Sequence, residues 1–391
     1  MRQDFVVRRF ELHASDADAL SAALDTLRRD VAKQPRDLIK ALPIRPSDRP
    51  PSATVTLKGQ ASVIAAIREN VAHVPKVRVL RDWLDVLAEE GDAPDAEDKI
   101  YPDRRALLRI DPDGRSRGVR GSGARLVVAV VDSGIMVDHP DFRGHLWTTK
   151  VDGRDVHGRC FLSAAEDYDL TDQDGHGTML AGSILATANA IQGLEIMAVK
   201  FFDVMTQPSA ANAAAAIGFA VANKASIINL SFDLGIGSYA LRDAIGAACA
   251  ADALVVIAAG NTGSDNDRFP LVPACYAKEF PDNVIVVMAT NEYDGKPTFS
   301  NFGSESVDLA APGVGIASTR PFFVGDNPAR RYGRYTGTSA AAAQVTGAAA
   351  LLRSLRPASK AKDIKNQILQ TADTLPGLRC RMSRRLNLGR F

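Results

Sequence analysis

Residues Leu126-Val127-Val128-Ala129-Val130-Val131 form an unbroken apolar run that ends in Asp132-Ser133-Gly134. A short strand with apolar side chains on both faces is typical of a parallel sheet buried between helices. Four similar runs follow, at 196–202, 226–230, 254–258 and 284–288. They alternate with helical patterns at 176–187, 209–223 and 238–251, and further helices are expected at 339–355 and 360–372. This alternation predicts an α/β fold with a doubly wound, mostly parallel sheet.

The first 90 residues have a different pattern, that of a smaller α+β domain. Strand character at 5–12, 53–57 and 77–79 alternates with apolar residues at helical spacing in 15–31 and 61–71. Two strand–helix–strand halves predict a ferredoxin-like domain, a four-stranded sheet covered by two helices, with one strand in the loop-rich part between Pro35 and Pro51.

A short acidic stretch separates the two patterns. Residues 91–97 are small, acidic and broken by proline, which is typical of a linker. The sequence therefore predicts an N-terminal domain at 1–90, a linker at 91–99 and a larger domain at 100–391.

The composition is that of an ordinary globular protein, with 46% hydrophobic and 24% charged residues among 391. Because 47 basic residues face 46 acidic ones, charge gives no reason to expect a nucleic acid or a membrane as partner. The N-terminus lacks the apolar core of a signal peptide, and no apolar run could span a bilayer. The four widely spaced cysteines are expected to be reduced thiols. We therefore expect a cytoplasmic protein.

Three segments supply the parts of an activated nucleophile. Asp132 ends the first strand, at the edge where open α/β sheets place functional groups. His176 begins a predicted helix between two glycines, and Ser339 begins another after Gly337-Thr338. A serine hydroxyl becomes a nucleophile when an imidazole takes its proton and a carboxylate orients that imidazole. Each residue alone has a structural explanation as a cap, ligand or packing group, but together they predict a catalytic triad.

A fourth segment fits the same chemistry. Asn261 follows a buried strand and the turn at Gly260, so that its amide could donate a hydrogen bond to the oxygen of a tetrahedral intermediate. The backbone N–H of Ser339, at the positive end of its helix, would be the second donor. On its own, Asn261 is equally well explained as a turn residue.

With these four parts in the order Asp, His, Asn, Ser, the chain resembles the subtilisin-like serine peptidases. The likeness covers about residues 100–391 and implies an α/β/α catalytic domain, endopeptidase activity on polypeptides and no cofactor. The matching segments are Asp132-Ser133-Gly134-Ile135, His139-Pro140-Asp141, His176-Gly177-Thr178, Ala258-Ala259-Gly260-Asn261, Ala310-Ala311-Pro312-Gly313, Gly337-Thr338-Ser339 and Arg385-Leu386-Asn387.

The chain departs from the family pattern at several positions. Ala340, Ala343 and Gln344 stand where the family usually has Met, Pro and His, and Met179 replaces a histidine. The short stretch between Leu185 and Val199 lacks the calcium loop of many members. We expect Asp138 and Asp141 to cap or pair locally instead of binding a cation, so no required metal is predicted.

The resemblance also suggests where a substrate would lie. Ser231-Phe232-Asp233 and Ala258-Ala259-Gly260 match the family's substrate walls. Phe232 is expected to narrow the pocket. The Asp233 carboxylate would favour Lys or Arg at P1, unless it points to solvent or caps a turn.

The N-terminal domain loosely resembles the family's inhibitory propeptide, through Ser52-Ala53-Thr54-Val55 and the elements that follow. As an inhibitor it would cover the cleft until the linker is cut; alternatively it is a permanent regulatory or docking domain.

Two other functions compete with an active peptidase. One is a catalytically silent binding module of the same fold, controlled by a regulatory protein partner. The other is a nucleotide-binding enzyme, which is disfavoured because Gly121-Ser122-Gly123 precedes its strand instead of following it.

Overall fold

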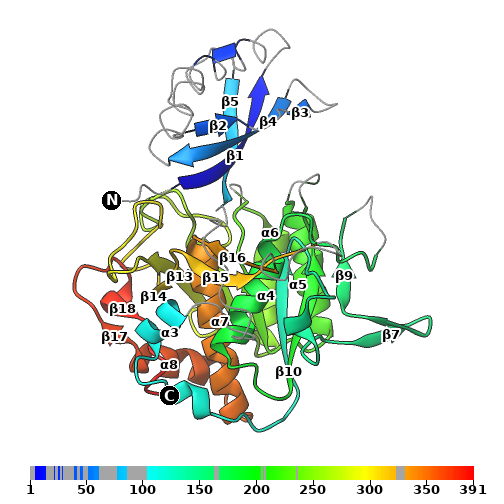
Figure 1. Ribbon diagram of the computed structural model, residues 1–391, viewed down its shortest axis with the longest axis vertical. Helices are drawn as coiled ribbons and strands as arrows, with labels where there is room; N and C mark the ends of the chain where they lie inside the picture. Colours follow the sequence, from blue (N-terminus) through cyan, green and yellow to red (C-terminus); the bar gives the residue numbers. More distant parts are fainter. Residues whose placement is uncertain are drawn as a thin grey trace. The chain divides into compact units, whose positions relative to one another are not determined.

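The computed structural model describes residues 104–391, apart from 163–166, 204–205, 207, 235–236 and 323–330. Of the first 103 residues it describes five strands and the isolated positions 22, 25, 26 and 29. The chain divides into two compact units, Met1–Leu87 and Ala88–Phe391 (Figure 1). The predicted linker at 91–99 lies outside the described residues, so the three domain boundaries stay predictions.

The first unit contains an antiparallel sheet in the order β2-β4-β1-β5, with β3 beside β4. Two short strands occupy the loop-rich part in which the sequence predicts one strand. Of the predicted helix at 15–31, the four described positions are helical, while the helix at 61–71 lies outside the described residues. The ferredoxin-like assignment therefore stays a prediction. The strands are β1 (Phe5–Ala14), β2 (Ile39–Ala41), β3 (Arg45–Pro46), β4 (Ser52–Gln60) and β5 (Val77–Asp85).

The second unit is built on the doubly wound, mostly parallel sheet that the sequence predicts. Its nine strands run in the order β17-β18-β14-β13-β12-β11-β6-β10-β9, and all neighbours are parallel except β17 and β18. The strands are β6 (Leu126–Asp132), β9 (Gly158–Cys160), β10 (Leu194–Lys200), β11 (Ile227–Leu230), β12 (Leu254–Ala258), β13 (Val284–Thr290), β14 (Leu309–Pro312), β17 (Asp373–Thr374) and β18 (Arg384–Arg385).

Helices cover both faces of this sheet. Val127, Ala129 and Val131 of β6 share one core with apolar residues of α5 and α6. The alternate residues Val128 and Val130 are equally buried and point to the other face, where α4 and α7 pack. The helices are α3 (Arg104–Ile110), α4 (His176–Thr187), α5 (Ala210–Ala222), α6 (Tyr239–Ala250), α7 (Thr338–Leu355) and α8 (Ala361–Thr371).

The strand order reverses at β6, because the chain first continues to β10 on one side and later to β11 on the other. At such a switch point the connections leave in opposite directions, and a crevice opens at the carboxyl ends of the strands. Asp132 is the last residue of β6, and Ser231 directly follows β11. The topology therefore brings these predicted site residues to one edge of the sheet.

A separate pair of strands packs against helix α4. It consists of β15 (Ile316–Thr319) and β16 (Tyr332–Tyr335), paired antiparallel. The hydroxyls of Ser318 and Thr319 donate to the carbonyl oxygens of Met179 and Thr178, each at 2.7 Å. A second hairpin joins β7 (Thr149–Val151) and β8 (Arg154–Val156).

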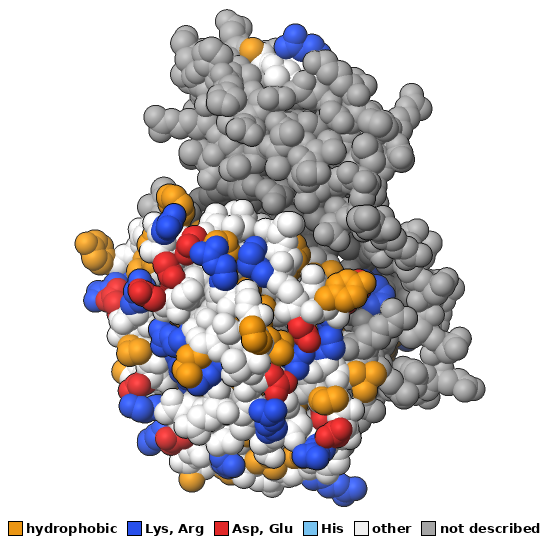
Figure 2. All heavy atoms as spheres, turned by 90° about the vertical axis from the view of Figure 1, so that its left-hand side faces the viewer, with side chains coloured by type: hydrophobic (Ala, Val, Ile, Leu, Met, Phe, Trp, Pro, Cys, Tyr) orange, Lys and Arg blue, Asp and Glu red, His pale blue; other side chains and the backbone are white. Residues whose placement is uncertain are grey.

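The visible surface of the second unit carries charges of both signs. Lys or Arg, Asp or Glu and hydrophobic side chains are interspersed over the face that Figure 2 shows. In the part of the chain that the structure describes, no helix combines the length and apolarity needed to cross a bilayer.

Candidate active site

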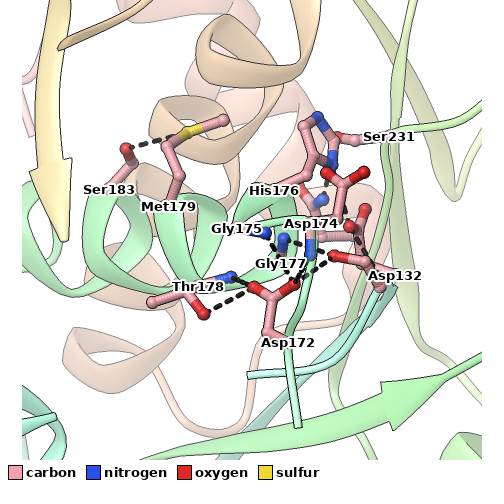
Figure 3. Close-up of polar contacts among 12 residues, drawn as sticks. Asp132, Asp172, Asp174, Gly175, His176, Gly177, Thr178, Met179, Ser183 and Ser231 are labelled. Carbon is pink, nitrogen blue, oxygen red and sulfur yellow. Dashed lines mark hydrogen bonds and ion pairs between the residues drawn. The ribbon is translucent and has the colours of Figure 1, made fainter. Parts of the chain in front are cut away.

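The structure joins Asp132 and His176 across two elements. The Nδ1 atom of His176, the first residue of α4, lies 2.8 Å from Oδ1 of Asp132 at the end of β6 (Figure 3). Asp132 is completely buried, whereas a quarter of the His176 side chain is exposed. The same Oδ1 atom accepts the backbone N–H of Ser133 at 2.8 Å. Because an ionised Asp132 can only accept, Nδ1 of His176 carries the hydrogen in this contact, and Nε2 is the nitrogen that can act as a base.

Close backbone packing allows this contact. A Cβ atom on Gly177 would overlap the carbonyl oxygen of Gly134 and would lie 3.3 Å from the Cβ of Asp132. Gly175, the N-cap of α4, has φ +90°, in the left-handed region that favours glycine. Glycine is therefore required on each side of His176 for a different reason: Gly175 for its backbone conformation, and Gly177 for lack of space for a Cβ atom.

The turn before α4 contains a carboxylate that the sequence analysis did not single out. Asp172 is 4% exposed and accepts hydrogen bonds from Ser133, Gly175 and Thr178. Burial raises the pKa of Asp172 to about 6, and the nearby charge of Asp174 adds to the shift. Its position four residues before His176 was the available signal, but an aspartate in a turn is ordinarily explained as a cap.

Asn261 is joined to the segment that carries Ser339. Its Oδ1 accepts from the backbone N–H of Thr338 at 2.8 Å and from the Thr338 hydroxyl at 3.0 Å. Because a backbone N–H can only donate, these bonds fix which end of the amide is oxygen and turn the NH₂ group away from Thr338. A Cβ atom built on Gly337 would lie 3.5 Å from Asn261 Nδ2 and 3.8 Å from the Ser339 nitrogen. The two predicted oxyanion donors thus border the same small space.

Ser339 is the second residue of α7 and is 7% exposed. The first four N–H groups of a helix have no partner within it, so the Ser339 N–H is available to an oxygen. Ser339 also lies at the positive end of this 18-residue helix, which favours a negatively charged oxygen beside its N–H.

A second asparagine holds the turn around Asn261. Asn301 is 1% exposed, and its Oδ1 accepts from the N–H groups of Thr262 and Ser264, both at 2.9 Å. Its own backbone N–H donates to the carbonyl oxygen of Gly260 at 2.9 Å. Gly260, with φ +104°, leaves no room for a Cβ atom, which would lie 2.6 Å from Asn301 Nδ2. Asn301 was not among the predicted site residues, because it lies outside every segment that resembles the family pattern.

The predicted substrate-wall residues lie in two different environments. Ala258 and Ala259 are buried, at 6% and 0% exposure, so their methyl groups belong mainly to the core. Phe232 is 9% exposed, and its ring centroid lies 4.6 Å from that of Phe201. Asp233 is half-buried. The expected roles of Phe232 and Asp233 in specificity stay predictions.

Ser231 is tied to the sheet and to helix α7 through Asn229. Its Oγ accepts from Asn229 Nδ2 at 2.9 Å, and Asn229 Oδ1 accepts from Thr346 on α7 at 2.8 Å. This chain of hydrogen bonds fixes the Ser231 hydroxyl at the carboxyl end of β11.

The departures from the family pattern are accommodated inside the fold. Gln344 is buried on α7, and its Nε2 donates to the carbonyl oxygen of Pro312, which ends β14. Met179 is buried in α4, where its sulfur accepts the Ser183 hydroxyl. Helix α7 continues through Ala343 without interruption, because alanine keeps the N–H that proline lacks.

The loop after β6 contains a buried cluster around His139. Asp141 accepts the Tyr332 hydroxyl at 2.9 Å, and the Asp141 N–H donates to Nδ1 of His139. Burial lowers the pKa of His139 and raises that of Asp141. Asp141 therefore pairs locally, while Asp138 is exposed. Among the described residues, no three His, Cys, Asp or Glu side chains converge as metal ligands. That no metal is required stays a prediction.

Comparisons with known proteins agree with this architecture. The sequence pattern of the Subtilase family matches residues 123–385. The chain is 33% identical to the alkaline elastase YaB of Bacillus sp. (strain YaB) over 270 residues, which are 68% of this chain and 63% of that protein. It is 36% identical to a thermostable alkaline protease of Halalkalibacterium halodurans over 266 residues, or 66% of this chain and 65% of that one. The match thus spans less than two thirds of the length of these two relatives.

A shorter relative matches over a similar range, and a solved structure shares the fold. Subtilisin DY of Bacillus licheniformis is 33% identical over 260 residues, which cover 65% of this chain and 85% of subtilisin DY. The crystal structure of a cold adapted subtilisin-like serine proteinase superposes with a TM-score of 0.58 at 24% identity, over 72% of this chain and 97% of that one. The family pattern spans more than half of the sequence, and the fold is shared: the chain belongs to the subtilase family.

Proposed function

We propose that this protein is a serine endopeptidase that cleaves polypeptides through an acyl-enzyme on Ser339. The observation that carries the proposal is the 2.8 Å contact between His176 Nδ1 and Asp132 Oδ1 at the switch point of the sheet. That contact orients the imidazole and stabilises its positive charge once it accepts a proton. Membership of the subtilase family supports the same activity.

In this mechanism each residue has one task. Nε2 of His176 takes the proton of the Ser339 hydroxyl, which attacks the scissile carbonyl carbon. The oxyanion that forms is stabilised by Asn261 Nδ2 and by the Ser339 N–H. The protonated imidazole then gives its proton to the leaving amine. In the second half of the reaction, the imidazole takes a proton from a water molecule, which attacks the acyl-enzyme, and returns the proton to the Ser339 oxygen as it leaves.

A fluorophosphonate probe tests this function, because it reacts covalently only with an activated serine. We expect wild-type protein to be labelled on Ser339, and Ser339→Ala and His176→Ala to remain unlabelled. Absence of labelling in the wild type, together with no cleavage of an unstructured protein such as casein, would favour the silent binding module instead.

We propose further that the N-terminal domain inhibits the catalytic domain until the chain is cut between them. The support is the loose likeness of Ser52-Ala53-Thr54-Val55 to the family's propeptides. Intact-mass analysis of wild type beside Ser339→Ala tests it. A shorter wild type with a full-length mutant is expected, whereas two full-length proteins would favour a permanent docking domain.

A further inference from the structure

One buried carboxylate close to His176 has no task in the mechanism above. Asp172 lies in the turn before α4 and is 4% exposed. Burying a carboxylate is costly unless hydrogen bonds replace its water. The number and direction of the bonds that Asp172 accepts therefore indicate what it holds in place.

The two oxygens of Asp172 bind different segments (Figure 3). Oδ1 accepts from the Ser133 hydroxyl at 2.9 Å, the Gly175 N–H at 2.8 Å and the Asp174 N–H at 3.2 Å. Oδ2 accepts from the N–H and the hydroxyl of Thr178, at 2.8 and 2.5 Å. One side chain thus caps the first turn of α4 and reaches the loop after β6.

These contacts flank the Asp132–His176 pair on both sides. Ser133 follows Asp132, and its hydroxyl also accepts the Gly177 N–H at 3.0 Å. Gly175 and Gly177 enclose His176 in the chain. Asp172 and Ser133 therefore hold the residues next to each member of the pair, without touching either side chain through a described hydrogen bond.

We propose that Asp172 is a positioning residue: its carboxylate sets the register between β6 and α4 at which Asp132 meets Nδ1 of His176. The inference rests on the proposed function and extends it to a residue that touches no substrate. The register matters because a displacement of about 1 Å in a catalytic group can cost about 10²-fold in rate.

An amide cannot replace this carboxylate. In Asp172→Asn one oxygen becomes an NH₂ group, which would face either the donors of Ser133 and Gly175 or those of Thr178. Donor would then oppose donor whichever way the amide turns. The substitution keeps the shape of the side chain and breaks its function as a bridge, so it is the sharpest test.

We expect Asp172→Asn to lower kcat by about 10- to 100-fold with KM changed by less than about threefold. The matched control is Asp169→Asn, an exposed aspartate of the same loop whose described hydrogen bonds all come from Thr171. Ser133→Ala removes the hydroxyl between Asp172 and Gly177 and should act in the same direction. It keeps the proposal testable should Asp172→Asn fail to fold.

The pH profile separates positioning from a loss of folded protein. Asp174 and Tyr335 interact electrostatically with Asp172, and Lys200 donates to the carbonyl oxygen of the preceding residue, Thr171. Because an imidazolium that no longer meets Asp132 at the right register is less stabilised, the acid limb of kcat/KM should move to lower pH in Asp172→Asn. Because the stability of Asp172→Asn relative to wild type itself depends on pH, each rate is divided by the folded fraction measured at the same pH before the profiles are compared.

A readout without substrate separates this proposal from the proposed function. The Nδ1 proton of His176 is observed by NMR in ¹⁵N-histidine-labelled protein and assigned with His176→Gln. We expect its resonance to shift or broaden in Asp172→Asn and to persist in Asp169→Asn. An unchanged resonance, or a folded Asp172→Asn with kcat within twofold of wild type, would overturn the proposal. If the wild type is inactive, only the proposed function fails, and the resonance still decides the role of Asp172.

Discussion

The orientation of single polar groups determines what this site can do. Asn261 presents its NH₂ group because Thr338 donates twice to its oxygen. His176 presents Nε2 because Asp132 accepts at Nδ1. In both residues a buried partner satisfies one end of the side chain and leaves the other end for chemistry. A single substitution at such a residue, or at its buried partner, therefore tests one hydrogen bond at a time.

Replacing Asn261 by alanine removes one oxyanion donor and leaves the nucleophile and the base in place. We expect kcat to fall by about 10²- to 10³-fold, the range known for the oxyanion asparagine of a subtilisin, with KM nearly unchanged. Steady-state kinetics on a chromogenic peptide gives both constants. An Asn261→Ala variant that turns over at the wild-type rate would remove Asn261 from the mechanism.

Asn301 contributes to the same site through the turn that it holds. Asn301→Ala leaves the N–H groups of Thr262 and Ser264 without their acceptor, and we expect a loss of about 2–3 kcal/mol in unfolding free energy. Because the turn carries Asn261, kcat should fall as well. Denaturant unfolding and kinetics are the two measurements.

The matched control for this change is Asn291→Ala. Asn291 also accepts two backbone N–H groups, from Tyr293 and Gly295, in a turn outside the site. It should lose stability without losing kcat. Equal kcat values in the two variants would show that the turn does not depend on Asn301.

At the level of the residues, the sequence singled out side chains with a chemical signature and did not single out the buried side chains that hold the neighbouring backbone. Asp132, His176, Asn261 and Ser339 lie in recognisable segments, and the structure brings the first two into contact and ties the third to the residue before the fourth. Asn301 was missed because it holds Thr262 and Ser264, which are distant in the chain. Asp172 was missed because its bonds to Gly175 and Thr178 are those of an ordinary helix cap, and only its bond to Ser133 reaches another element.

At the level of elements, helix α4 depends on close contact with the hairpin behind it. A Cβ atom on Gly182 would overlap Thr319 Oγ1 and lie 2.7 Å from Ser318 Oγ, both on β15. Those hydroxyls bind carbonyl oxygens in the first turn of the helix that begins with His176. The close spacing between α4 and β15 is therefore possible only because Gly182 has no Cβ atom.

We expect Gly182→Ala to lower the unfolding free energy by about 1–3 kcal/mol, because overpacking forces β15 away from α4. The control is Gly218→Ala in the interior of α5, where a Cβ atom would have nothing within 4 Å. Alanine there should stabilise the protein by about 0.5–1 kcal/mol through its better helix propensity. Thermal or urea unfolding of both variants measures the contrast, and the same sign for the two changes would contradict this argument.

Elements were predictable where burial gives a long and regular pattern. Strand β12 has the predicted bounds, and α4 begins and ends at the predicted residues. Strands β9, β17 and β18 were not predicted, because two or three residues contain no measurable periodicity. Their place depends on pairing with neighbours that are remote in sequence.

At the level of the whole molecule, the candidate active site lies at the switch point of the sheet, where the strand order reverses. The fold buries the carboxylate of Asp172 close to this point, which is costly in free energy. Ionised Asp172 is buried beneath the first turn of α4, although an unfolded chain would leave it in water. Its pKa is raised from 3.8 to about 6, chiefly by burial. The folded state therefore binds this proton more tightly than the unfolded state does.

This difference has a definite sign for stability. Below pH 4 Asp172 is largely protonated in both states, and its ionisation makes no difference to stability. Above pH 6 it is largely ionised in both, and the folded state bears the penalty of a buried charge. The shift of about 2.2 pH units corresponds to about 3 kcal/mol of unfolding free energy, which is lost as pH rises from 4 to 6. Other carboxylates titrate in the same range, so only a difference between variants isolates this contribution.

The measurement is urea unfolding of Ser339→Ala and of Ser339→Ala/Asp172→Asn from pH 4 to pH 7, with the nucleophile removed to prevent self-cleavage. The asparagine does not titrate, so the stability of the aspartate protein relative to the asparagine protein should decline by about 3 kcal/mol as pH rises through this range. A constant difference would mean that Asp172 has an ordinary pKa. A difference that grows in favour of aspartate would mean that its five hydrogen bonds outweigh the cost of burial. If the stability difference declines as predicted, the ionised Asp172 lowers the stability of the folded protein at neutral pH. Such a cost is consistent with a residue whose role is to position the Asp132–His176 pair.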